Sequence, residues 1–326
     1  MMNIKGRYKI YENGIEVCNQ NNILTKFGKR FLTNYLAGVT NFSSKNIVIG
    51  LGDTTPTIND NRLDFEFYSS PVDISSPNIE TDPITGTTTY SVVYKTSLPN
   101  DVVGIIKEVG LFPSQSTKKT DYSDRYISSF ENSLSWVDSD GNNPTLVTSP
   151  TPRLGTYLFE ITAPTVFSPT TFSTKEYWFN TDFDLSGYSV YDSLTLVFRQ
   201  ADTNLDYIYI RFYSGDTDYY ETRISGDASI TSPNKPDKIK SVTLAELFGS
   251  NTKSGSPDAK SINKILVGVK SKSLTATTVY LDGLKINDED SFDPTYGLIS
   301  RAVLTSPISK VSGKQMDIEY RLDLSF

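Results

Sequence analysis

One segment of the chain places aromatic and hydrogen-bonding side chains on the same face of an expected strand. In residues 207–213, YIYIRFY, side chains alternate between two faces because successive Cβ atoms of a strand point to opposite sides. Isoleucine and phenylalanine occupy one face, and the other face carries Tyr207, Tyr209, Arg211 and Tyr213. Such rings can stack on sugar rings while phenol and guanidinium groups bond to sugar hydroxyls. The segment therefore indicates a glycan-binding face, to which Trp178 can contribute another ring.

Two other interpretations fit the same residues. Tyrosine and arginine are enriched in protein interfaces, so the face also suits a protein partner. An ordinary solvent-facing strand of a sandwich has the same alternation, and Trp178 suits a core position equally well. Glu108 is a lone acid within the apolar run 102–114. We interpret it as a strand residue on the solvent face or as an acid with a structural partner, rather than as a catalytic group.

Composition excludes several kinds of chemistry. The 326 residues contain no histidine and one cysteine, Cys18, which excludes His-based nucleophile pairs, His-ligated metals and an intrachain disulfide. A formal charge of −7 and the absence of a basic cluster argue against nucleic acid binding. No apolar run is long enough for a membrane span, and the charged, alternating N-terminus does not resemble a secretory signal. Paired carboxylates can hydrolyse glycosides, but no pair is marked by the sequence, so we expect no enzyme.

The first third of the chain combines strands with one helix. Asn13-Gly14 between two alternating runs predicts a β-hairpin. Helical spacing of apolar residues follows, with Thr25 as the expected N-cap and Gly38 as the terminator. The stretch 45–67 contains a strand ending in Gly50-Leu51-Gly52, where we expect glycine backbone angles to allow a sharp turn into a loop at 53–61. A phosphate cradle would need further glycines or Gly-Lys-Ser/Thr, which are absent.

The remainder predicts a mainly β protein with two domains. Residues 154–290 show short strands at regular spacing, typical of a β-sandwich or jelly roll, with one helical turn at 244–248. Residues 114–153 are rich in Ser, Asn and Pro and are interpreted partly as linker. Residues 315–326 alternate without a break and predict a closing strand. We therefore expect a discontinuous β domain with one N-terminal helix, 1–150 and 291–326, and an inserted jelly roll, 154–290.

Three patches in order resemble virion structural proteins of tailed bacteriophages. They are NNILTKFGKRFLTNYLAG with NIVIGLGDTTPTINDNRLDFE, then GIIKEVGLFPS, and finally RAVLTSPISKVSGKQMDIEYRLDLSF. The resemblance covers about residues 1–113 and 296–326. It implies a docking domain that binds other virion proteins as a homo-oligomer, a trimer or larger ring, at the tail, baseplate, neck or capsid surface.

The inserted segment resembles carbohydrate-binding modules with a jelly-roll fold. The resemblance lies in FDLSGYSVYDSLTLVFRQ, DYIYIRFYS and INKILVGVKS…TTVYLDGLKIND. In such modules, matching acids hold a structural Ca²⁺, which here implies Glu160 and Asp282. Two carboxylates with loop carbonyls can contribute to such a site, but both acids can equally cap or pair locally.

Together these features predict a non-enzymatic phage virion protein that displays a glycan-binding domain for host adsorption. We expect it in the virion, assembled in the host cytoplasm and released by lysis, with a cell-surface glycan as a further partner. The alternatives are a phage-borne or secreted glycan-degrading enzyme, and a capsid decoration protein whose insertion binds nothing.

Overall fold

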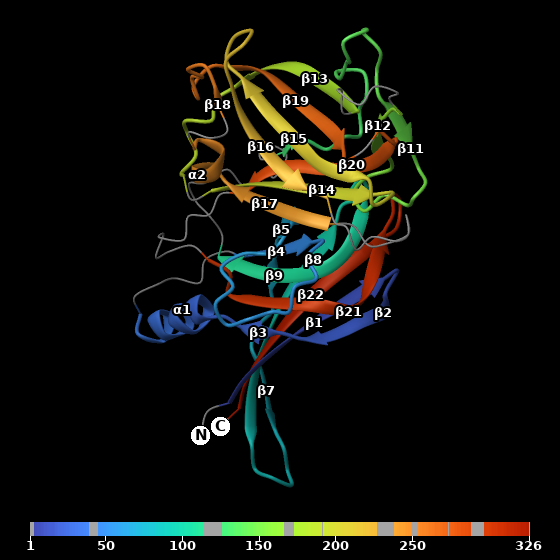
Figure 1. Ribbon diagram of the computed structural model, residues 1–326. Helices are drawn as coiled ribbons and strands as arrows, with labels where there is room; N and C mark the ends of the chain where they lie inside the picture. The colour runs from blue at the N-terminus through green and yellow to red at the C-terminus, as the bar shows by residue number, and fades with distance from the viewer. Residues whose placement is uncertain are drawn as a thin grey trace. The chain divides into compact units, whose positions relative to one another are not determined.

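The computed structural model describes residues 3–38, 45–113, 126–165, 173–190, 192–226, 238–249, 253–272, 274–287 and 297–325. The chain is mainly β, as predicted, and it divides into two compact units (Figure 1). The first unit is Met1–Asp124 with Ser291–Phe326, and the second is Arg125–Asp290. Within the described ranges, no helix is both long and apolar enough to cross a membrane.

Two antiparallel sheets form the first unit. Sheet A has the order β2 (Ile15–Asn21), β1 (Asn3–Glu12), β22 (Met316–Ser325), β8 (Thr88–Leu98) and β6 (Asp73–Ile74), with β7 (Asn78–Thr81) also paired to β8. Sheet B has the order β3 (Ile23–Leu24), β21 (Ser300–Lys310), β9 (Gly104–Pro113), β4 (Lys45–Gly50) and β5 (Glu66–Pro71). Because β22 pairs with β1 along its whole length, the last segment completes a sheet that the first segment begins.

Several local predictions for this unit are confirmed. Asn13 and Gly14 have φ of +50° and +80°, the left-handed values that a two-residue hairpin turn requires. The helix α1 (Lys26–Leu36) begins where expected, since the backbone N–H of Gly28 donates to Thr25 Oγ1 at 2.9 Å. Gly38 follows the helix with φ of +70°. Alternate residues of β22 are buried, beginning with Met316.

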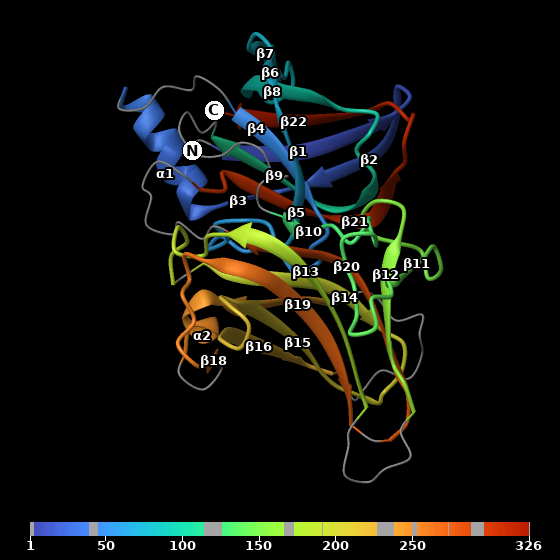
Figure 2. The ribbon, with the colours of Figure 1, turned by 90° about the horizontal axis from the view of Figure 1, so that it is seen from above.

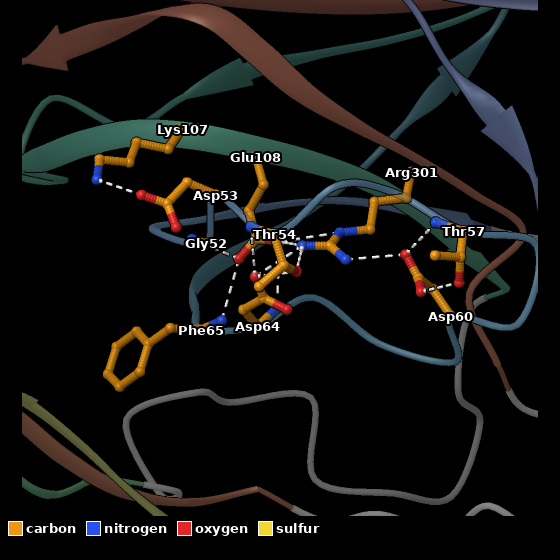
Figure 3. A network of polar contacts seen from close by, with 10 residues as sticks. All are labelled: Gly52, Asp53, Thr54, Thr57, Asp60, Asp64, Phe65, Lys107, Glu108 and Arg301. Atoms are coloured by element: carbon orange, nitrogen blue, oxygen red, sulfur yellow. Dashed lines mark hydrogen bonds and ion pairs between the residues drawn. The ribbon is translucent and has the colours of Figure 1, made fainter. Parts of the chain in front are cut away.

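A buried ion pair holds the loop that follows β4 (Figure 3). Glu108 of β9 and Arg301 of β21 are both buried, and Arg301 Nη2 lies 2.8 Å from Glu108 Oε2. Arg301 Nη1 lies 2.8 Å from Asp60 Oδ2 within the loop. The Glu108 carboxylate also accepts backbone N–H groups from Gly52, Asp64 and Phe65. Burial raises the pKa of Glu108 and the charge of Arg301 opposes this. Of the two interpretations of Glu108, the acid with a structural partner is therefore confirmed, and the solvent-facing position is wrong because the side chain is buried.

Gly50 and Gly52 leave space for this carboxylate. The prediction that they use glycine-specific backbone angles was wrong, because neither has a positive φ. A Cβ placed on either glycine would lie 2.5 Å from Glu108 Oε1, closer than real Cβ atoms come to other atoms. Glycine is thus required here because the Glu108 side chain packs directly against the backbone.

The second unit is a β-sandwich of two antiparallel sheets. Sheet C has the order β11 (Thr145–Val147), β12 (Leu158–Ala163), β20 (Thr277–Asn287), β14 (Ser193–Gln200) and β17 (Lys238–Thr243), with β10 (Tyr126–Ser128) also paired to β20. Sheet D has the order β13 (Thr174–Phe183), β19 (Ile262–Ser271), β15 (Leu205–Tyr213), β16 (Tyr219–Ser225) and β18 (Lys253–Ser254). Apolar residues of both sheets share one core. The expected helical turn is α2 (Leu244–Leu247).

The boundary between the units differs from the predicted one. Residues 126–150 belong to the sandwich, whereas we expected them in the first domain and partly as linker. Phe130 and Trp136 are buried in the sandwich core, and the backbones of Val137 and Trp178 exchange two hydrogen bonds of 2.9 Å. Residues 114–125 of the expected linker lie outside the described residues. Composition alone does not reveal the few long-range contacts by which a polar segment joins the core.

Candidate functional site

The alternation predicted for β15 is confirmed. Its even-numbered residues from 208 to 212 lie in the core between the sheets. The opposite face carries the four predicted residues, Tyr207, Tyr209, Arg211 and Tyr213. We call the outward side of β13, β19, β15 and β16 the D face (Figure 2).

Strand register aligns side chains in rows across the D face. One row consists of Trp178, Leu266, Arg211 and Glu221. The next row consists of Glu176, Gly268, Tyr209 and Arg223. A third row consists of Asn180, Lys264, Tyr213 and Tyr219. The structure thus places Trp178 in the same cluster as the predicted tyrosines.

Arg211 occupies the middle of the D face. Its Nε donates to Glu221 Oε2 at 2.7 Å, and its Nη1 lies 3.4 Å from Glu176 Oε1. The guanidinium carbon lies 4.8 Å from the Tyr209 ring centre and 4.7 Å from that of Tyr219. Burial lowers the pKa of Arg211, but hydrogen bonds to Glu221 and to a tyrosine hydroxyl raise it more, so the side chain remains charged. Arg211 on β15 therefore links Glu176 of β13 and Glu221 of β16 through hydrogen bonds and ion pairs.

Tyr209 lies flat over the neighbouring strand. Gly268 of β19 pairs with it, and a Cβ at that position would overlap the ring. The Tyr209 hydroxyl donates to Glu176 Oε1 at 2.5 Å. Burial and this bond to a carboxylate hold the pKa of Tyr209 well above its usual value. The Tyr209 side chain is consequently held in place and uncharged, and it packs against Gly268 beneath the polar groups.

The accessible rings differ in part from those predicted. Tyr209 and Tyr213 are only 4% and 8% exposed, and the Lys264 ammonium sits 4.0 Å from the Tyr213 ring centre. These two tyrosines support the face but offer no open ring to a ligand. Half-buried rings that reach the surface are Trp178, Tyr207 and Tyr219. Arg223 lies 4.7 Å from the Tyr207 ring centre with its side chain 57% exposed.

Five charged or aromatic residues of these three rows were not predicted. They are Glu176, Tyr219, Glu221, Arg223 and Lys264. Period-two alternation in β13, β16 and β19 predicts that each points outward, since each has one neighbour, Tyr177, Tyr220, Ile224 or Ile265, that lies in the core or packs against it. Their alignment with β15 depends on the register between strands, which a single sequence does not supply.

The structure places the two residues implied for a calcium site on neighbouring strands. Asp282 is buried, and its Oδ2 accepts the backbone N–H of Arg153 at 2.7 Å. Glu160 lies on the paired strand β12, opposite Tyr280. In the part of the chain that the structure describes, no group of three or more His, Cys, Asp or Glu residues is placed to hold a metal ion. Calcium needs six to eight oxygen ligands, so Glu160 and Asp282 would need carbonyl or water oxygens beside them, and the Ca²⁺ site stays a prediction.

Fold and site define the chain as a two-unit β protein whose second unit is a β-sandwich with an aromatic, charged outer face. No protein-family model matches it, and no curated protein matches it. Solved structures that it resembles include a family 11 carbohydrate-binding module from Clostridium thermocellum in complex with a β-1,3-1,4-mixed-linked tetrasaccharide, at 15% identity and TM-score 0.36, covering 50% of this chain and 94% of that one.

Two further solved structures show the range of these similarities. One comes from a study of promiscuous specificity in carbohydrate-binding modules of the β-sandwich superfamily, at 13% identity and TM-score 0.34, covering 75% of this chain and 85% of that one. The other is an agarase, at 13% identity and TM-score 0.34, covering 52% of this chain and 25% of that one.

Proposed function

We propose that the chain is a non-enzymatic glycan-binding protein whose binding site is the D face. The observation that carries this proposal is the cluster of surface-reaching rings beside charged hydrogen-bonding groups on one sheet. Trp178, Tyr207 and Tyr219 supply apolar surfaces for sugar rings. Arg223, Lys264 and Glu176 supply donors and acceptors for sugar hydroxyls.

The absence of catalysis is part of the proposal. Glu176 and Glu221 are the carboxylates of the D-face rows, and both are hydrogen-bonded or ion-paired to Arg211. General acid catalysis of glycoside cleavage needs a carboxylic acid placed to donate its proton to the leaving oxygen. Two carboxylates that share one arginine suit hydrogen bonding to hydroxyls better than proton donation.

The first unit is proposed to dock the protein into a tailed-phage particle. The ordered motifs at residues 1–113 and 296–326 support this role, and they come together in one unit, where Glu108 pairs with Arg301. In this proposal the particle carries many copies, and weak binding at each D face adds up to avidity for a cell surface. Assembly in the host cytoplasm and release by lysis belong to the same proposal.

A glycan array probed with the full chain tests the binding function. Trp178→Ala and Tyr207→Ala should each lower affinity for the selected glycan by about tenfold or more, because rings at the centre of a binding surface contribute about 1–2 kcal/mol or more each. Tyr157→Ala is the matched control, since this tyrosine is 39% exposed and lies outside the D face. An array without any binding would contradict the proposal.

Catalysis is tested with the same glycans. The full chain should leave them intact after prolonged incubation. Cleavage that stops in Glu176→Gln or Glu221→Gln would establish a glycan-degrading enzyme and overturn the non-enzymatic proposal.

A further inference from the structure

The first unit carries an acidic hairpin that extends from sheet A (Figure 1). It consists of β7, a turn at 82–87 and the start of β8, and we call residues 73–91 the arm. The arm contains Asp73, Glu80 and Asp82 and no lysine or arginine. None of these carboxylates forms an ion pair with a residue that the structure describes. The arm is therefore a local concentration of negative charge.

The tip of the arm is an ordered turn with an exposed apolar side chain. Asp82 Oδ1 accepts the backbone N–H of Ile84 at 2.8 Å, and Gly86 adopts φ of +70°. Ile84 is 93% exposed and Ile79, on β7, is 60% exposed. Because hydrogen bonds fix the turn, Ile84 is held outward by the fold rather than exposed through fraying.

The helix α1 of the same unit has the opposite charge. It contains Lys26, Lys29 and Arg30, all exposed, and no acidic residue. Neither lysine forms an ion pair with a residue in the described ranges. Phe27 and Phe31 stack on the same helix at 5.9 Å, with the Arg30 guanidinium over Phe27. The helix thus presents positive charge beside a half-buried aromatic pair.

We propose that the arm of one copy binds α1 of a second copy, head to tail. Lys26 and Lys29 are about 4.5 Å apart along the helix axis, and Glu80 and Asp82 are about 6.6 Å apart along the strand. Flexible lysine side chains span the difference. Ile84 at the tip then packs beside the stacked phenylalanines.

Such a contact repeats around a ring. The arm and α1 are different surfaces of one unit, so each copy uses its arm toward one neighbour and its helix toward the other. Heterologous contacts of this kind produce closed rings when the rotation between copies closes. The inference identifies the surfaces of the homo-oligomer and does not depend on glycan binding by the D face.

Sedimentation velocity of the full chain tests the contact. The wild type should sediment as an oligomer at about 0.05 M salt and dissociate toward monomer at about 1 M, where the electrostatic screening length falls to about 3 Å. Glu80→Lys with Asp82→Lys, and Lys26→Glu with Lys29→Glu, should each give monomers at low salt. Asp216→Lys, an exposed charge reversal in the second unit, is the matched control and should remain oligomeric.

Mixing the two monomeric variants provides the decisive step. The reversed arm of one variant faces the reversed helix of the other, and the unchanged surfaces also match, so the mixture should recover the oligomer. A monomeric wild type at low salt, oligomers in both reversal variants, or a mixture that stays monomeric would each overturn the proposal. Retained glycan binding by the monomeric arm variant, Glu80→Lys with Asp82→Lys, would separate this result from the D-face proposal.

Discussion

Gly268→Ala should destabilise the second unit by placing a methyl group against the Tyr209 ring. A Cβ there would lie 2.6 Å from ring atom Cε2, so the ring or β19 has to move. Overpacking of this kind costs about 1–3 kcal/mol. Replacing glycine also restricts the unfolded chain, which offsets about 0.4–1 kcal/mol. We therefore expect a net loss of about 1–2 kcal/mol in the free energy of unfolding.

Urea denaturation followed by tryptophan fluorescence measures this loss for the second unit alone. Both tryptophans of the chain, Trp136 and Trp178, belong to that unit. Gly187→Ala is the matched control, because a Cβ at Gly187 meets open space. In a Tyr209→Ala background the clash is gone, and Gly268→Ala should cost less than about 0.5 kcal/mol. An equal cost in both backgrounds would refute the stated packing of the ring.

Two further predictions concern buried charges. Arg301→Met should destabilise the first unit by about 3–5 kcal/mol at neutral pH, because Glu108 then stays buried without its cation. Burial already raises the pKa of Glu108, so protonation of this carboxylate at lower pH should reduce the loss of stability in Arg301→Met. Hydrogen exchange at residues 50–65 measures this loss. A loss of stability that does not depend on pH would contradict the account. The hydrogen bond from Lys175 lowers the pKa of Asp138 from its usual 3.8. The stabilisation that the Lys175–Asp138 pair contributes is therefore present above pH 3.8 and is lost as the pH falls below it. Asp138→Asn should therefore weaken the acid sensitivity of tryptophan fluorescence. An unchanged acid transition would argue against the pair.

Period-two patterns were sufficient to predict much of this fold. Strands such as 193–200 and 219–225 lie within the region 154–290 that was predicted to hold short strands, and the alternation at 207–213 correctly separated core from surface. Local chemistry also sufficed for the Asn13-Gly14 turn and the Thr25 cap. In each case the signal lies within a few neighbouring residues, so no knowledge of distant contacts is needed.

Long-range packing limited the prediction of the D face. Which tyrosines remain accessible depends on β19, where Gly268 allows Tyr209 to lie flat and Lys264 covers Tyr213. That alignment is set by a register shift between Leu205 and Tyr207, which no local pattern signals.

The same limit affected the polar segment at 126–150. Trp136 packs against Phe159 at 5.2 Å between ring centres, a contact across 23 positions in a sequence that otherwise has linker composition. This error arose because burial of a few side chains outweighs average composition.

Footprinting of the full chain with and without its array-selected glycan tests the central proposal most directly. Hydroxyl radicals modify accessible aromatic side chains, and a bound sugar shields the rings that it covers. The proposed D face predicts protection of Trp178, Tyr207 and Tyr219 while Tyr157 stays equally reactive. Protection confined to Tyr157 or to the first unit, with the three D-face rings unchanged, would contradict it.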